Sequence, residues 1–207
     1  MTLIVALRHA PTAWNRDQRL QGRTDVALDE EGIAVAARWR TPPDWASHRI
    51  LSSPLQRARM TAAILFPDAE IGIDRRLIEM DFGSWEGKRL AELRADPTED
   101  AAAREGLGLD FKAPEGESPR EVQERIRPLL ARLAELQRPT ALVTHKAVIR
   151  ALYALASGWT MIGKPPTKLR PNCAQLFRLG QDGAPAVERL NVRLDGIESE
   201  GKRPRRT

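Results

Sequence analysis

Two short apolar runs of the same kind, far apart in the chain, constrain the fold most. Leu3–Leu7 (LIVAL) and Ala141–Thr144 (ALVT) contain β-favouring residues without the polar alternation of a half-exposed strand. Such runs are typical of strands that are buried on both faces, as in parallel sheets covered by helices. A histidine, His9 or His145, follows each run. Because parallel strands open on one edge of a sheet, we expect the two imidazoles to lie close together.

Helix and strand patterns alternate along the rest of the chain. Further strands are expected over residues 49–51, 71–73, 174–179 and 187–192, and helices over residues 30–39, 54–65, 118–136 and 147–156. This alternation predicts an α/β fold: a single three-layer domain with a mostly parallel central sheet and helices on both faces.

Capping residues mark the expected helix starts. Ser118 can cap a helix in which Glu121 reaches back to the backbone, and Ser53 with Pro54 is expected to cap and start another. The helix that Asp29 opens is expected to bury an apolar stripe of Ile33, Ala36, Ala37 and Trp39.

No repeat or linker divides the chain, so we expect one domain over residues 1–194 and a basic, disordered tail over residues 195–207. The net charge is +5, but the tail sequence GKRPRRT holds four positive residues, and without them the charge falls to +1. The basic balance therefore describes the tail, and it is a weak argument for a nucleic-acid partner.

The cysteine content and the apolar segments bear on the compartment. Cys173 is the only cysteine, which excludes an intramolecular disulfide and suits a reducing compartment. The chain shows no signal-peptide pattern and no apolar run of about 18 residues. We therefore expect a cytoplasmic protein that has no membrane partner.

Two stretches of charged or polar residues remain. Residues 96–117 are rich in glycine, proline and acidic residues, a composition typical of a lid, a binding loop or a mobile segment. His48 lies in a polar turn before a strand, and we expect it at the surface.

Five charged or titratable residues lie at strand ends or in turns. Arg8 precedes His9, Arg57 lies in the first turns of the helix after Ser53, and Glu79 precedes a turn with glycines. A lone Arg8–His9 pair is also consistent with a solvated strand end. Together with His145, these residues suit phosphoryl transfer, because arginines bind phosphate oxygens, an imidazole can attack phosphorus and a carboxyl can protonate the leaving oxygen.

Several motifs, in order, resemble those of the histidine phosphatase superfamily, also called the phosphoglycerate mutase-like family. They are Arg8-His9-Ala10-Pro11-Thr12 with Asn15, the segment GRTDVALDEEG, Ser52-Ser53-Pro54-Leu55-Gln56-Arg57-Ala58, Leu77-Ile78-Glu79 with GSWEG, Gly116-Glu117-Ser118 and Thr144-His145. The resemblance covers roughly residues 2 to 190.

The resemblance implies a role for each matching residue. His9 is expected to be the nucleophile that becomes phosphohistidine, and Glu79 the proton donor and later the base. The expected phosphate pocket consists of Arg8, Arg57 and His145, and the expected substrate-binding residues are Asn15, Gln21, Gly22 and Lys146. The resemblance implies a small phosphorylated substrate, no cofactor and no metal, because protein cations replace magnesium.

Two departures from the family pattern stand out. Ala10 and Lys146 follow the two histidines where the family has glycine. Alanine and lysine retain the backbone N–H, but close approach or a positive φ is harder without glycine. Lys146 also opens a helix, where its positive charge is disfavoured. Either it binds a second negative group of the substrate or it extends into solvent.

Three functions are compatible with this resemblance: a phosphatase for small phosphomonoesters, a cofactor-dependent phosphoglycerate mutase, and a weakly active binding protein. The mutases carry Glu-Arg-x-Tyr-Gly after the acid, whereas this chain has Glu79-Met80-Asp81-Phe82-Gly83. This difference favours the phosphatase. The leaving group and the oligomeric state stay open.

Overall fold

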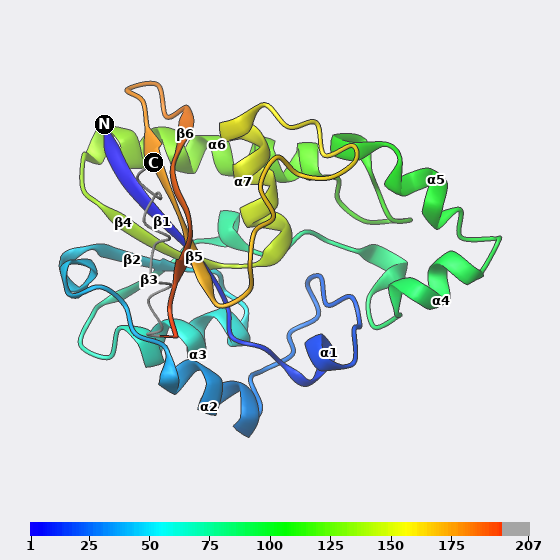
Figure 1. Ribbon diagram of the computed structural model, residues 1–207, viewed down its shortest axis with the longest axis horizontal. Coiled ribbons are helices and arrows are strands. Elements are labelled where there is room, and N and C mark those ends of the chain that lie inside the picture. Colours follow the sequence, from blue (N-terminus) through cyan, green and yellow to red (C-terminus); the bar gives the residue numbers. More distant parts are fainter. Residues whose placement is uncertain (196–207) are drawn as a thin grey trace, which may run out of the picture.

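A six-stranded sheet forms the centre of the computed structural model, which describes residues 1–195 (Figure 1). The strands are β1 (Thr2–Arg8), β2 (Arg49–Ser52), β3 (Ile71–Ile73), β4 (Thr140–Thr144), β5 (Cys173–Leu179) and β6 (Pro185–Arg193). Their order is β3-β2-β4-β1-β5-β6. The first four strands in this order are parallel, and β5 and β6 are antiparallel to their neighbours.

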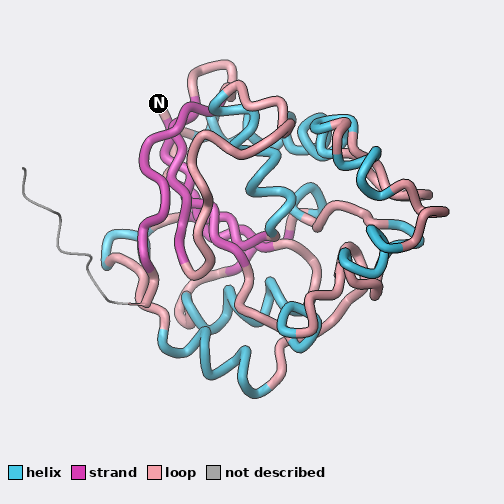
Figure 2. Tube along the Cα trace, turned by 45° about the vertical axis from the view of Figure 1, so that its right-hand side comes forward, coloured by secondary structure: helices cyan, strands magenta, loops and turns pink. Residues whose placement is uncertain are grey.

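Helices cover both faces of this sheet. They are α1 (Ala13–Arg16), α2 (Glu30–Arg38), α3 (Gln56–Leu65), α4 (Leu90–Ala95), α5 (Ala101–Glu105), α6 (Pro119–Leu136) and α7 (Lys146–Ser157). Helices α6 and α7 lie on one face, and α2 and α3 lie on the other, which Figure 2 shows from a second side. The predicted three-layer α/β fold is thus confirmed.

The unbroken apolar run of β1 is explained by two cores. Successive side chains of a strand point to opposite faces. Ile4 and Ala6 accordingly pack with α6 and α7, whereas Val5 and Leu7 pack with α2 and α3. A strand whose side chains pack into two cores has no exposed face. Polar and apolar residues therefore do not alternate along it.

The boundaries of α6 follow the sequence closely. Ser118 accepts a hydrogen bond from the Glu121 backbone, and the Glu121 side chain accepts one from Ser118 N. This capping box satisfies two N–H groups that have no partner in the first turn.

Two helix predictions were partly wrong. In α2 the buried residues are Gly32, Ala36 and the following Trp39, whereas Ile33 and Ala37 are exposed. The face at residues 32, 36 and 39 meets the core because the Gly32 backbone lies against Pro11. Helix α3 begins at Gln56, and its N-cap residue is Leu55, without a side-chain cap.

Residues 83–118 extend beyond the carboxyl ends of the parallel strands, at the right of Figure 1. They contain α4, α5 and two 3₁₀ turns, η3 (Gly83–Trp85) and η4 (Gly108–Asp110), which the sequence patterns did not predict. A small core of their own holds them together, made of Trp85, Leu93, Ala101 and Ala113.

The remaining 3₁₀ turns are η1 (Pro43–Ser47) and η2 (Arg75–Leu77). The predicted basic tail over 195–207 lies outside the described residues except for Asp195. Among residues 1–195, no helix is long and apolar enough to cross a membrane.

Candidate active site

The carboxyl ends of β1, β2 and β4 meet at one edge of the sheet. Arg8 ends β1, Ser53 follows β2, and His145 follows β4. Backbone hydrogen bonds continue past the strand ends, from His9 N to Thr144 O (2.9 Å) and from Ser53 N to Val143 O (3.0 Å). These bonds fix the positions of the residues that carry the candidate chemistry.

A cavity of about 810 Å³ opens at this edge. Eight of the nine site residues expected from the sequence line it: Arg8, His9, Asn15, Gln21, Gly22, Arg57, Glu79 and Lys146. The ninth, His145, has no exposed surface and lies beside His9, with the ring centroids 5.1 Å apart and the planes inclined by 56°. The two imidazoles are neighbours, as the strand pattern predicts.

His9 is held as a neutral imidazole with a defined tautomer. Its Nδ1 lies 2.7 Å from Ala10 O, and because a carbonyl only accepts, Nδ1 carries the proton. Burial lowers the pKa of His9 well below its usual range, and the nearby charges of Arg8 and Arg57 lower it further. The ring is therefore neutral, and Nε2 keeps its lone pair.

His145 is fixed through a hydroxyl. Its Nε2 lies 2.7 Å from Ser53 Oγ, whereas its Nδ1 has no hydrogen-bond partner among the described residues. Burial lowers the pKa of His145 well below its usual range, and the proximity of His9 and Arg57 adds to the effect. Ser53 Oγ accepts a hydrogen bond from Leu55 N (3.3 Å), so its own proton is free for His145 Nε2. In that tautomer Nδ1 carries the ring proton and can donate to an anion.

Arg8 and Arg57 each have one buried side-chain donor that makes no hydrogen bond within the described residues. Arg57 has no exposed surface, and its terminal nitrogens donate to Thr24 O (2.8 Å) and Gly22 O (2.7 Å). The Nε atoms of Arg8 and Arg57 have no partner in the described part of the chain. Buried N–H donors without a partner are rare, and an oxyanion in the cavity satisfies them.

Glu79 lies against the first turn of α7. Its Oε1 accepts hydrogen bonds from Met80 N (2.9 Å) and Ala147 N (3.2 Å). Burial raises the pKa of Glu79, although these two bonds and the charge of Arg57 oppose the rise. A carboxyl with a raised pKa holds a proton more readily, as a general acid requires.

Asn15 and Gln21 are connected through Thr12. Asn15 Oδ1 accepts from Thr12 N (3.1 Å) in the capping box of α1, and Thr12 Oγ1 donates to Gln21 Oε1 (3.1 Å). Because these contacts use the amide oxygens, the NH₂ groups of Asn15 and Gln21 stay available as donors. Gly22 contributes its carbonyl to Arg57.

The structure explains the two departures from glycine. Neither Ala10 nor Lys146 has a positive φ, so the backbone does not require glycine at either position. Ala10 is fully buried, and its N–H donates to Thr61 Oγ1 (2.9 Å). Lys146 lies on the cavity wall with its side chain exposed, and desolvation there, with the charges of Arg8 and Arg150, lowers its pKa.

Ser53 and Arg150 were not predicted as site residues, and the predictions for the Ser53 cap and for His48 were wrong. Ser53 contacts His145 instead of capping α3. Arg150 lines the cavity one turn after Lys146, and its i+4 spacing was the available signal.

His48 was expected at the surface, but it is buried and stacks on Trp45 with ring centroids 6.4 Å apart. It lies at the amino end of β2, away from the cavity.

No group of three or more His, Cys, Asp and Glu side chains within residues 1–195 is placed to hold a metal ion.

Comparisons with known proteins give consistent results. The sequence matches the histidine phosphatase superfamily (branch 1) over residues 4–193. A protein named a probable phosphoglycerate mutase from Citrobacter koseri is 30% identical over 183 residues, which cover 84% of this chain and 83% of that protein.

Several solved structures share the fold. A mycobacterial glucosyl-3-phosphoglycerate phosphatase in complex with inorganic phosphate has a TM-score of 0.77 and 26% identity, covering 93% of this chain and 98% of that one. A phosphoserine phosphatase from Entamoeba histolytica in complex with 3-phosphoglyceric acid has the same score and identity, with 92% and 97% covered. The alpha-ribazole phosphatase of Shigella flexneri has a TM-score of 0.75 and 27% identity, covering 95% of this chain and 100% of that one. The chain belongs to the histidine phosphatase superfamily, branch 1.

Proposed function

We propose that this protein is a metal-independent phosphatase that hydrolyses small phosphomonoesters through a phosphohistidine on His9. The observation that carries the proposal is the neutral His9 ring, whose Nδ1 is bound to Ala10 O and whose Nε2 keeps its lone pair beside buried arginine donors. The names of the solved neighbours support phosphatase chemistry, since they include phosphatases for three different phosphomonoesters.

In the first step, the Nε2 lone pair of His9 attacks phosphorus and the bond from phosphorus to the leaving oxygen breaks. Glu79 gives its proton to that oxygen, and the alcohol departs. Arg8, Arg57 and the Nδ1–H of His145 stabilise the charge on the equatorial oxygens. Because Nδ1 of His9 stays bonded to Ala10 O, the phosphorylated ring is cationic and offsets charge on the phosphoryl group.

In the second step, the Glu79 carboxylate takes a proton from a water molecule. The water oxygen bonds to phosphorus, the N–P bond breaks, and inorganic phosphate leaves. Nε2 recovers its lone pair and Glu79 its proton, so the enzyme returns to its starting state. Asn15 and Gln21 position the substrate with their amide donors, and the protein cations do the work that Mg²⁺ does in kinases.

The test is to trap the intermediate. Brief incubation with a ³²P-labelled phosphomonoester, followed by an alkaline quench, should leave label on wild-type protein and none on His9→Ala. His48→Ala is the matched control, because His48 is buried but remote from the cavity, and it should be labelled normally. Label on His9→Ala, or label that survives acid but not alkali, contradicts the proposal.

The mutase is the second candidate, because the curated relatives carry the name of a probable phosphoglycerate mutase. Where the mutase motif has arginine, however, this chain has Met80, which packs in the α6–α7 core and lines the cavity without a positive charge. We therefore expect 3-phosphoglycerate, with 2,3-bisphosphoglycerate present, to yield inorganic phosphate faster than 2-phosphoglycerate, after the phosphate released from 2,3-bisphosphoglycerate alone is subtracted. The reverse ratio would establish the mutase.

The proposed catalytic unit is residues 1–194, acting in the cytoplasm without a cofactor. The lone cysteine supports a reducing compartment, and it is buried.

A further inference from the structure

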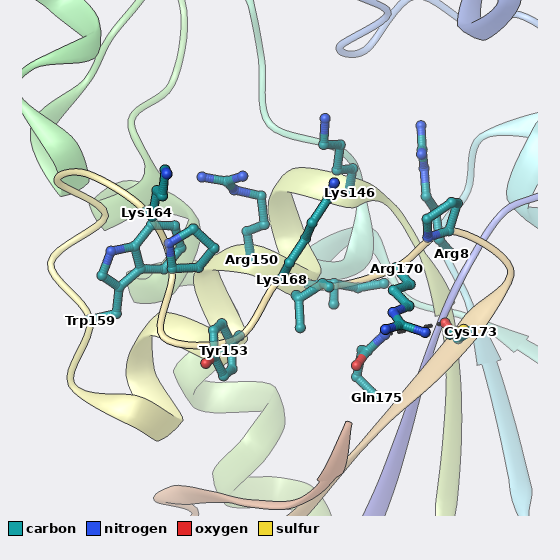
Figure 3. Close-up of a pocket in the computed structure, with 14 residues that line it drawn as sticks. Arg8, Lys146, Arg150, Tyr153, Trp159, Lys164, Lys168, Arg170, Cys173 and Gln175 are labelled. Carbon is teal, nitrogen blue, oxygen red and sulfur yellow. Dashed lines mark hydrogen bonds between the residues drawn. The ribbon is translucent and has the colours of Figure 1, made fainter. Parts of the chain in front are cut away.

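A second cavity, of about 630 Å³, adjoins the catalytic one (Figure 3). Helix α7 forms one wall, and the segment 159–173, which leads from α7 to β5, forms the other. Arg8, Lys146 and Arg150 line both cavities. These three side chains therefore form the shared boundary of the two cavities.

The lining of the second cavity carries one sign of charge. Its charged residues are Arg8, Lys146, Arg150, Lys164, Lys168 and Arg170, and no acidic residue lines it. None of the six forms an ion pair with a carboxylate of the described residues, although arginines elsewhere, such as Arg94 and Arg120, do so. Figure 3 shows Arg8, Lys146, Arg150 and Lys164 extending to the same side of the cavity.

This clustering is costly in the absence of an anion. Like charges at close range repel, and desolvation strengthens the repulsion. Desolvation by the surrounding residues lowers the pKa of Arg150 and of Lys146. The charges of Arg8 and Arg150 lower the pKa of Lys146 further, although Glu79 opposes this effect. Lys146 also occupies the first turn of α7, where the helix dipole disfavours a cation. An anion beside Lys146 and Arg150 offsets the repulsion between their positive charges.

The wall that carries the basic residues is anchored. Tyr153 Oη accepts a hydrogen bond from Thr167 N (2.9 Å). Asn191, on β6, accepts from Arg170 N (2.7 Å) and donates to Lys168 O (3.1 Å). Backbone contacts on both sides of Leu169 thus fix the segment that carries Lys168 and Arg170.

The floor of this cavity is apolar. Ile149, Tyr153, Trp159, Leu169 and Pro171 contribute to it. The Arg150 guanidinium lies over the Trp159 ring, 5.0 Å from its centroid, and this stacking orients the side chain. A cavity with an apolar floor and a basic rim suits an organic body that carries an anionic group, and its volume lies in the usual range for small-molecule sites.

We propose that the second cavity binds a second phosphate group of the substrate, so that the preferred substrates are small organic bisphosphates. One phosphate lies at His9, the body crosses Lys146 and Arg150, and the remote phosphate lies against the basic lining of the second cavity, at Lys168, which extends toward Lys146 in Figure 3. The number of unpaired cations favours a phosphate dianion over a carboxylate. The inference rests on the proposed phosphatase activity and names its substrate class.

The test compares matched substrates. We measure kcat/KM for ribulose 5-phosphate and ribulose 1,5-bisphosphate, and for glycerol 3-phosphate and 3-phosphoglycerate. In wild-type protein the bisphosphate should exceed its monophosphate by about tenfold or more, equivalent to about 1.4 kcal/mol. The added carboxylate of 3-phosphoglycerate should give a clearly smaller gain. Equal gains for phosphate and carboxylate overturn the assignment to phosphate, and no gain for either overturns the subsite.

Charge-removing variants locate the effect. In the double variant Lys164→Met/Lys168→Met, the ratio of bisphosphate to monophosphate kcat/KM should fall about tenfold. Arg127→Met/Arg138→Met is the control, because it removes two exposed charges that line neither cavity. An equal fall in the control means that net charge alone sets the ratio, and the subsite is then wrong.

A binding measurement separates this inference from the proposed function. In His9→Ala, calorimetry should show the bisphosphate binding about tenfold more tightly than the monophosphate, with the difference lost when Lys164 and Lys168 are also replaced. This result stands even if no phosphomonoester is hydrolysed, which would refute the phosphatase alone. Equal binding of the two ligands refutes the subsite alone.

Discussion

Ser53 and His145 are 92 residues apart in the chain, yet Ser53 Oγ lies 2.7 Å from His145 Nε2. Both side chains are fully buried. A hydroxyl can donate to one imidazole nitrogen and thereby keep the proton on the other. In this site the result is a donor, Nδ1–H, that belongs to a neutral ring and has no partner among the described residues.

Ser53→Ala should therefore reduce kcat by about tenfold to a hundredfold, because His145 loses its tautomer and its orientation. Vanadate affinity should fall in parallel, since vanadate imitates the five-coordinate phosphorus. Ser52→Ala is the control: the Ser52 hydroxyl is buried next door but donates to Ser53 O. Similar kinetic losses in both variants would show that packing, not the contact with His145, is responsible.

Glu79→Gln should slow turnover most for poor leaving groups. Sugar and glycerol phosphates need a proton on the departing oxygen, whereas aryl phosphates need little help. We expect a loss in kcat of about a hundredfold or more for glycerol phosphate and a much smaller loss for p-nitrophenyl phosphate. Equal losses for the two substrates would be incompatible with Glu79 as the acid.

The same substitution should change stability with pH. Because burial raises the pKa of Glu79, the folded protein holds a proton that the unfolded chain releases, so wild-type stability falls as pH rises through the raised pKa. Glu79→Gln lacks this cost. Its free energy of unfolding should exceed that of wild type at pH 7 and match it below about pH 4. Urea titrations at both pH values check this, with Glu124→Gln, an exposed residue on α6, as the control.

Turnover should be unaffected by EDTA and inhibited by vanadate. In the proposed mechanism, Arg8, Arg57 and His145 offset the phosphoryl charge, and no step uses a metal. Phosphate release is measured before and after chelation, with and without added Mg²⁺, Mn²⁺ or Zn²⁺. Activity that disappears with EDTA and returns with one of these ions would require a different mechanism.

Gly83 should be far less replaceable than Gly158, although both have a positive φ. A Cβ on Gly83 would lie 2.1 Å from Pro114 O, whereas a Cβ on Gly158 would meet nothing within 4 Å. Gly158→Ala should cost about 1 kcal/mol of stability from backbone strain alone. Gly83→Ala should cost about 2–4 kcal/mol, because the segment at Pro114 must move. Equal losses of unfolding free energy for the two variants in urea denaturation would mean that the segment at Pro114 moves without a measurable cost.

Much of the fold was predictable because its information is local. The runs at β1 and β4 are apolar because the side chains of each strand pack into two cores. The proximity of the two histidines follows from the parallel pairing of these strands, which aligns Arg8 with Thr144. The start of α6 was predictable because Ser118 and Glu121 lie three residues apart. In such cases a few neighbouring residues determine the structure.

The rest depends on contacts between distant segments. Helices α4 and α5 are short and have weak patterns of their own, and they are held by packing around Trp85 and Leu93. Ser53 has the sequence position of a cap, but its hydroxyl is taken by a residue from another strand. His48 is buried because η1 brings Trp45 over it. Propensity does not reveal such tertiary effects.

His9 and His145 follow strand ends, and Glu79 lies after η2 against the first turn of α7, whereas residues 83–118 and 159–173 supply much of the walls of the two cavities. We therefore expect changes in either wall to leave the proposed nucleophile, His9, and the proposed acid, Glu79, in place. A library that varies Lys164, Lys168 and Arg170 explores new substrates while the reaction itself is inherited unchanged. Substitutions in the cavity walls can therefore change the substrate during evolution while the reaction is retained.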